Sequence, residues 1–116
     1  MTPDELQERT TEFGIRVLNL IDALPRRRSA DVIAGQLGRA ATSVGANYRA
    51  ARRARSKREF RSKLSVVVEE ADESEHWLSV LSRMSMINPE RITDLHREAG
   101  ELLRIFARMR KTAYAT

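Results

Sequence analysis

Cysteine is absent from the sequence, which excludes disulfide bonds, thiolate metal sites and cysteine nucleophiles. Three prolines and five glycines in 116 residues are too few for an all-β chain with many tight turns. Aromatic residues make up only 5% of the chain, so aliphatic residues must build most of the core. No apolar run approaches the roughly 20 residues that a bilayer crossing needs. The acidic, polar first residues are not typical of a signal peptide, so we expect a cytoplasmic protein that does not associate with membranes.

Hydrophobic residues recur every three or four positions along four segments, which is the pattern of amphipathic helices. The predicted helices span residues 4–24, 30–53, 57–84 and 89–111, and the tail at 112–116 is expected to fray. Thr2, Ser29 and Ser56 are the expected N-caps of the first three helices. Four helices joined by short connections predict an all-α fold, an antiparallel up-down-up-down four-helix bundle that forms a single domain over residues 1–116.

The second predicted helix carries a stripe of small residues beside its core stripe, formed by Ala34, Gly38, Ala41 and Gly45. A glycine inside a helix costs about 1 kcal/mol relative to alanine. Retaining two of them makes sense if another helix backbone approaches closely at this stripe. The alternative is an alanine-rich helix that merely tolerates glycine. On the core stripe, either Asn47 or Tyr48 faces inward.

The third predicted helix has two apolar stripes, although one stripe is enough to close a bundle. We expect the second stripe, with the acids that interrupt it, to form an oligomer interface: Val66, Glu70, Glu73, Trp77, Val80 and Met84. In this interpretation the two acids meet arginines of a neighbouring chain, and the head-to-tail contact closes into a ring. The alternative is that Trp77 packs between helices of its own bundle.

Positive charge is concentrated in one part of the chain. Residues 26–63 contain twelve Lys or Arg and two acids, whereas the rest of the chain is net acidic, and the whole carries a formal charge of +5. Arginine suits phosphate because its guanidinium group offers paired donors. The sequence therefore predicts nucleic-acid binding by Arg39, Arg49, Arg52, Arg53, Arg55, Lys57, Arg58, Arg61 and Lys63. The alternative is that these cations pair with acids of a neighbouring subunit.

Catalytic and metal sites have little support in the sequence. Glu73 and His76 have the Glu-x-x-His spacing of di-iron bundles, but such a site needs a second motif, and Thr93 precedes His96 at the matching offset. No serine has an identifiable base, and the glycines lie inside a helix instead of in a phosphate-binding loop. We therefore expect no enzymatic activity, no cofactor and no metal.

The stretch from Ser43 to Leu78 resembles a known family. The motifs that carry the resemblance are Ser-Val-Gly-Ala-Asn-Tyr-Arg-Ala at 43–50, Arg-Ala-Arg-Ser at 53–56, Phe-x-x-Lys-Leu at 60–64, and Glu-Ala-x-Glu-x-x-x-Trp-Leu at 70–78. They are similar to those of four-helix bundle proteins encoded in bacterial 23S rRNA intervening sequences, and to accessory proteins of diversity-generating retroelements. The resemblance implies a bundle, homopentamer assembly and nucleic-acid binding. His76 departs from it, because tyrosine is more usual there.

Two functions from different classes follow from these patterns. The leading hypothesis is a non-enzymatic, oligomeric bundle that contacts the phosphate backbone of RNA or DNA through the basic segment. Because phosphate contacts carry no sequence information, we expect weak specificity and strong sensitivity to salt. The alternative is a scaffold or accessory subunit that docks an acidic protein partner, such as a reverse transcriptase.

Overall fold

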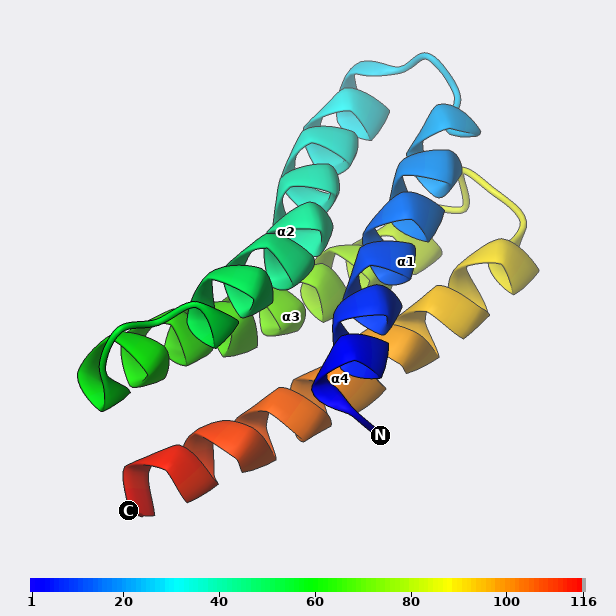
Figure 1. Cartoon of the computed structure of the whole chain (residues 1–116). Coiled ribbons are helices and arrows are strands. Elements are labelled where there is room, and N and C mark those ends of the chain that lie inside the picture. The colour runs from blue at the N-terminus through cyan, green and yellow to red at the C-terminus, as the bar shows by residue number, and fades with distance from the viewer. Residues whose placement is uncertain (116) are drawn as a thin grey trace.

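The computed structural model describes residues 1–115, which form four helices: α1 (Pro3–Asp22), α2 (Arg28–Arg52), α3 (Lys57–Arg83) and α4 (Pro89–Ala115). Consecutive helices run in opposite directions and lie side by side in an elongated molecule of 46 × 23 × 21 Å (Figure 1). The connections are short, and no strand occurs between residues 1 and 115. The predicted antiparallel four-helix bundle is confirmed.

Two of the expected helix caps are present and one is not. The Thr2 hydroxyl accepts a hydrogen bond from the Glu5 amide at 3.1 Å, and the Ser56 hydroxyl accepts one from the Glu59 amide at 3.1 Å. Ser29 is not a cap, because α2 already begins at Arg28, and Arg27 in the cap position makes no side-chain capping bond. The prediction at Ser29 was therefore wrong by two residues.

The last helix is longer than its sequence pattern indicated. It continues to Ala115 instead of ending near residue 111, and Thr116, the end of the expected frayed tail, lies outside the described residues. Arg61 of α3 holds these final turns: its Nε donates to the Ala113 carbonyl at 2.9 Å. The Arg61 guanidinium also lies 5.3 Å from the centre of the Tyr114 ring. A tertiary contact therefore extends the helix.

The core follows the predicted apolar stripes. Tyr48, not Asn47, faces inward, and its ring meets Phe106 edge-on with centroids 5.1 Å apart. The two fully buried polar residues donate to carbonyls of their own helices, Thr10 to Gln7 at 2.7 Å and Ser74 to Glu70 at 2.8 Å. Each buried hydroxyl group therefore keeps a hydrogen-bond partner, and its burial does not carry the cost of an unsatisfied polar group.

The small-residue stripe of α2 faces α1 at close range. A Cβ atom on Gly45 would lie 3.2 Å from the Thr10 hydroxyl and 3.5 Å from the Thr10 backbone carbonyl. From the other side, a Cβ atom on Gly14 would lie 3.5 Å from the Cα of Thr42. The Gln7 amide also donates to the Gly45 carbonyl at 3.1 Å. The predicted close contact is confirmed, and it lies within one chain.

A polar cluster joins α1 to α4. Arg9 donates from Nε to Glu98 at 2.7 Å and from a terminal nitrogen to Glu101 at 2.6 Å. The hydrogen bond to Glu98 is the main reason that the pKa of Arg9 is raised above its ordinary value. Arg9 and Glu98 are both mostly shielded from water, so this pair is screened less than an exposed one. The cluster therefore fixes α1 against α4.

The glycine contact yields a stability prediction. Gly45→Leu should lower the free energy of unfolding by about 2 kcal/mol, because added bulk must push α1 away from α2. Gly35 is a matched control in the same helix, since among residues 1–115 no side chain or neighbouring helix comes within 4 Å of its Cβ position. Gly35→Leu should raise the free energy of unfolding by about 0.5–1 kcal/mol through helix propensity. Urea unfolding followed by circular dichroism measures both, and a Gly45→Leu protein at least as stable as the parent would contradict the close-contact account.

Candidate nucleic-acid interface

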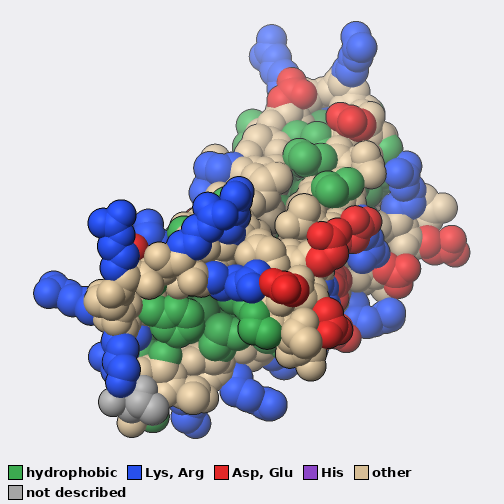
Figure 2. Space-filling model, in the orientation of Figure 1, with side chains coloured by type: hydrophobic (Ala, Val, Ile, Leu, Met, Phe, Trp, Pro, Cys, Tyr) green, Lys and Arg blue, Asp and Glu red, His purple; other side chains and the backbone are tan. Residues whose placement is uncertain are grey.

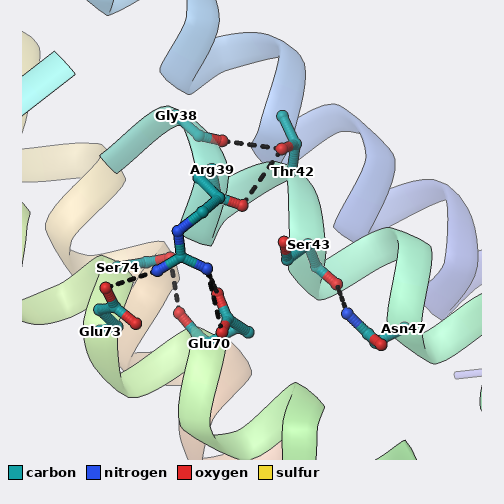
Figure 3. Close-up of polar contacts among 8 residues, drawn as sticks. All are labelled: Gly38, Arg39, Thr42, Ser43, Asn47, Glu70, Glu73 and Ser74. Carbon is teal, nitrogen blue, oxygen red and sulfur yellow. Dashed lines mark hydrogen bonds and ion pairs between the residues drawn. The ribbon is translucent and has the colours of Figure 1, made fainter. Parts of the chain in front are cut away.

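Arg39, one of the residues predicted to bind nucleic acid, forms ion pairs with acidic residues of its own chain (Figure 3). Its guanidinium lies 3.1 Å from a Glu70 oxygen and 2.7 Å from a Glu73 oxygen. Hydrogen bonding, first to Glu73 and then to Glu70, raises the pKa of Arg39. Both acids therefore have a partner within their own chain, and their predicted contact with arginines of a neighbouring chain stays a prediction. The contact joins α2 to α3 within one molecule, because antiparallel packing brings position 39 opposite positions 70 and 73.

The remaining cations gather where α2 ends and α3 begins, and we call residues 49–63 the basic end. In Figure 2 the Lys and Arg side chains of this region project from one end of the molecule. Among residues 1–115, no ion pair or side-chain hydrogen bond involves the side chains of Arg49, Arg53, Arg55, Lys57, Arg58 and Lys63. All of them except Lys63 are exposed. The basic end therefore presents unpaired donors to solvent.

Two shallow hollows lie along the last turns of α2. One, of about 470 Å³, is lined by Arg49, Arg53 and Arg55 together with Ala46, Ala50 and Glu59. The other, of about 310 Å³, is lined by Gln7, Arg49, Arg52 and Arg53. Arg49 and Arg53 line both hollows because residues four apart share one helix face. Two guanidinium groups on one face, with Glu59 as the single acid in the lining, suit a phosphate group.

Two of the residues predicted to bind nucleic acid at this end make contacts within the chain. Arg52 pairs with Asp4 of α1 at 2.7 Å and lies 5.8 Å from the centre of the Tyr48 ring. Arg61 donates to the carbonyl of Ala113, as described above. The sequence pattern could not separate these residues from their unpaired neighbours, because it gives the helix face and not the element that packs there. Arg52 and Arg61 add positive potential, but part of their donor capacity is used within the chain.

The end of α4 contributes cations that the sequence interpretation did not assign to the site. Because α4 runs antiparallel to α3 and Ala113 bonds to Arg61, residues 108–111 lie near the start of α3. They include Arg108, Arg110 and Lys111, and Arg108 lines a further hollow of about 400 Å³ with Glu101, Arg104 and Ile105. At the predicted end of this helix, near residue 111, such cations are explained by a favourable interaction with the helix dipole alone. Pairing the third and fourth helices in antiparallel register would have placed them beside the basic segment.

The second apolar stripe of α3, predicted as an oligomer interface, is not bare in the single chain. Trp77 and Val80 are half-buried and pack against the core of their own bundle, Val66 is also half-buried, and only Met84 is exposed, at 39%. Hydrophobic side chains that are more exposed than Met84 lie on other helices, on α1 at Ile15 (46%) and Leu18 (44%), on α2 at Val32 (61%), and on α4 at Tyr114 (58%). The interface on α3 stays a prediction, without the exposed patch that motivated it.

The two histidines lie on an acidic surface of α3 and α4. They line a hollow of about 720 Å³ together with Glu69, Asp72, Glu73, Glu75 and Ser79. Within residues 1–115, no three side chains of metal-ligating type are grouped so that they could hold a metal ion. Nor does any helix in this range combine the length and apolar character that a membrane crossing requires.

Comparison with known proteins adds two findings. The family described as 23S rRNA-intervening sequence protein matches residues 5–108. Among solved structures, the chain is similar to a protein of unknown function from the S23 ribosomal protein family of Bacteroides thetaiotaomicron, with a TM-score of 0.86 and 31% sequence identity. That similarity covers 96% of this chain and 99% of the other. A comparison with curated proteins finds no match.

Proposed function

We propose that this chain, which belongs to the 23S rRNA-intervening sequence protein family, is a non-enzymatic RNA-binding bundle that holds the phosphate backbone at its basic end. The observation that supports this most directly is the set of exposed, unpaired cations around the α2–α3 turn. Acids are available on α3, but two of them bind Arg39 instead. Glu59 lies among these cations and Asp4 pairs with Arg52, but among residues 1–115 no acid pairs with the other cations of the basic end, so a polyanion would supply the negative charge that they lack.

The helix dipoles do not account for these cations. Arg49 and Arg52 lie in the last turn of α2, where positive charge is favourable. Lys57 and Arg58, however, occupy the first two positions of α3, where the dipole is positive and cations are unfavourable. Glu59 is the only acid in that turn. A charge arrangement that opposes the helix dipole is better explained by a ligand than by stability.

Charge reversal tests the proposal. In the triple variant Arg49→Glu, Arg53→Glu, Arg58→Glu, affinity for an RNA hairpin should fall by about 100-fold at low salt. The slope of log affinity against log salt concentration should become shallower by about three units, one for each lost phosphate contact. Fluorescence anisotropy with end-labelled RNA measures both, and circular dichroism checks that the helices are retained.

A matched control carries the same change in net charge at the opposite end of the bundle. Arg26, Arg27 and Arg28 are exposed and lie at the α1–α2 connection. Their reversal to Glu should reduce RNA affinity by no more than a few-fold. Equal losses in both triple variants would mean that only net charge matters. Unchanged affinity in the basic-end variant, together with tight binding of an acidic polypeptide, would favour the alternative scaffold function.

We also propose, from the family resemblance, that the chain is a homo-oligomer with five copies. The exposed Ile15 and Leu18 pair on α1 supports association, because it leaves apolar surface in water on one helix face. Light scattering should give about five times the chain mass of 13.2 kDa. Leu18→Glu should lower that mass without loss of helicity if this face is buried between copies. A parent protein that scatters as a monomer would contradict the oligomer proposal.

A further inference from the structure

An exposed aromatic side chain stands among the cations at the end of α4. The chain has six aromatic residues, and the five others lie in the core or pack against it. Tyr114, by contrast, is 58% exposed. The Arg61 guanidinium lies over its ring at 5.3 Å, and Arg61 is itself fixed by the bond to the Ala113 carbonyl. One face of the ring is therefore covered by a positioned cation, while much of the side chain remains open to solvent.

The end of the bundle that carries Tyr114 is apolar as well as basic. Phe60, Met109 and Ala113, from the facing ends of α3 and α4, are only partly buried against the core. Figure 2 shows hydrophobic side chains at this end of the molecule with Lys and Arg on both sides. Partly exposed apolar side chains at this end are therefore flanked by cations. A ligand that offers phosphates alone would leave these apolar side chains in contact with water.

Paired and unpaired RNA differ in what they offer to such a surface. A duplex presents its phosphates and ribose hydroxyls, while its bases are stacked inside. An unpaired strand presents phosphates together with free base faces, which stack on aromatic side chains and arginine planes. Tyr48 lies in the core and Phe60 packs against it, so neither offers a free ring face at this end. Tyr114 does, and the continuation of α4 to Ala115 places it beside Arg61.

We infer that the basic end selects unpaired RNA, with a base stacked on the open face of Tyr114 and the neighbouring phosphates held by the cations of α2, α3 and α4. This inference rests on the proposed function, and it adds the class of RNA. Arg61 has a double role in it. Its Nε holds the end of α4, and its two terminal nitrogens, which make no hydrogen bond among residues 1–115, are available for the phosphate beside the stacked base.

The test compares two RNA probes of equal length, an unpaired strand carrying 2-aminopurine and the corresponding blunt duplex, on the full chain. The parent should bind the unpaired strand about tenfold more tightly, and it should change the 2-aminopurine fluorescence through stacking. Tyr114→Ala should lower the ratio of single-strand to duplex affinity by about tenfold, the effect of one stacked base. Tyr114→Phe, which retains the ring, should keep both the ratio and the fluorescence change. Both variants keep the hydrogen bond from Arg61 to the Ala113 carbonyl that holds the end of α4, so neither should alter the helical circular dichroism.

The outcomes separate this inference from the proposed function. If the parent binds both probes equally, or if Tyr114→Ala leaves the affinity ratio unchanged, stacking is overturned. Phosphate binding then still stands if the triple reversal of Arg49, Arg53 and Arg58 abolishes binding of both probes. If the parent binds neither RNA, both proposals fail. A triple variant that keeps the parent's affinity for both probes would contradict the phosphate site, whereas a triple variant that binds both probes more weakly but keeps the single-strand preference would support stacking.

Discussion

Positive charge at the start of α3, which opposes the helix dipole and is offset in that turn by Glu59 alone, is the constraint on which the rest of the structure depends. Lys57 and Arg58 face the positive end of their own helix dipole, and Arg53 and Arg55 lie just before them. Such an arrangement favours fraying and separation of the helices. It persists because other contacts hold the bundle: the glycine contact between α1 and α2, the Arg9 cluster between α1 and α4, and the hydrogen bond from Arg61 to the end of α4.

The long helix α3 carries both signs of charge and separates them along its length. Its middle turns supply Glu70 and Glu73, and these bind Arg39. At 1.5 Å per residue, the four turns between Arg58 and Glu73 span roughly 20 Å, well beyond a Debye length at physiological salt. The acids therefore cannot neutralise the basic end from within the chain. One helix thus stabilises the bundle in its middle and presents a charged surface at its start.

Much of this fold could be predicted from the sequence, because apolar spacing specifies the buried face of each helix. The buried set includes Leu37, Leu64 and Leu102, all on predicted stripes. The pattern also placed the basic segment correctly as a continuous stretch. It could not show that Arg39 is paired while Arg53 is not, because that depends on the register between two helices. It also missed Arg108 and Tyr114, which lie about fifty residues from the basic segment and approach it only through antiparallel packing.

Arginine modification with phenylglyoxal, read by mass spectrometry with and without bound RNA, tests the central claim most directly, because each guanidinium reports on its own position. Protection by RNA should be strong at Arg49, Arg53 and Arg58. Arg26 and Arg27, which are exposed at the opposite end, should react equally with and without RNA. If RNA protects the opposite end, and the arginines of the basic end stay fully reactive, the account is contradicted.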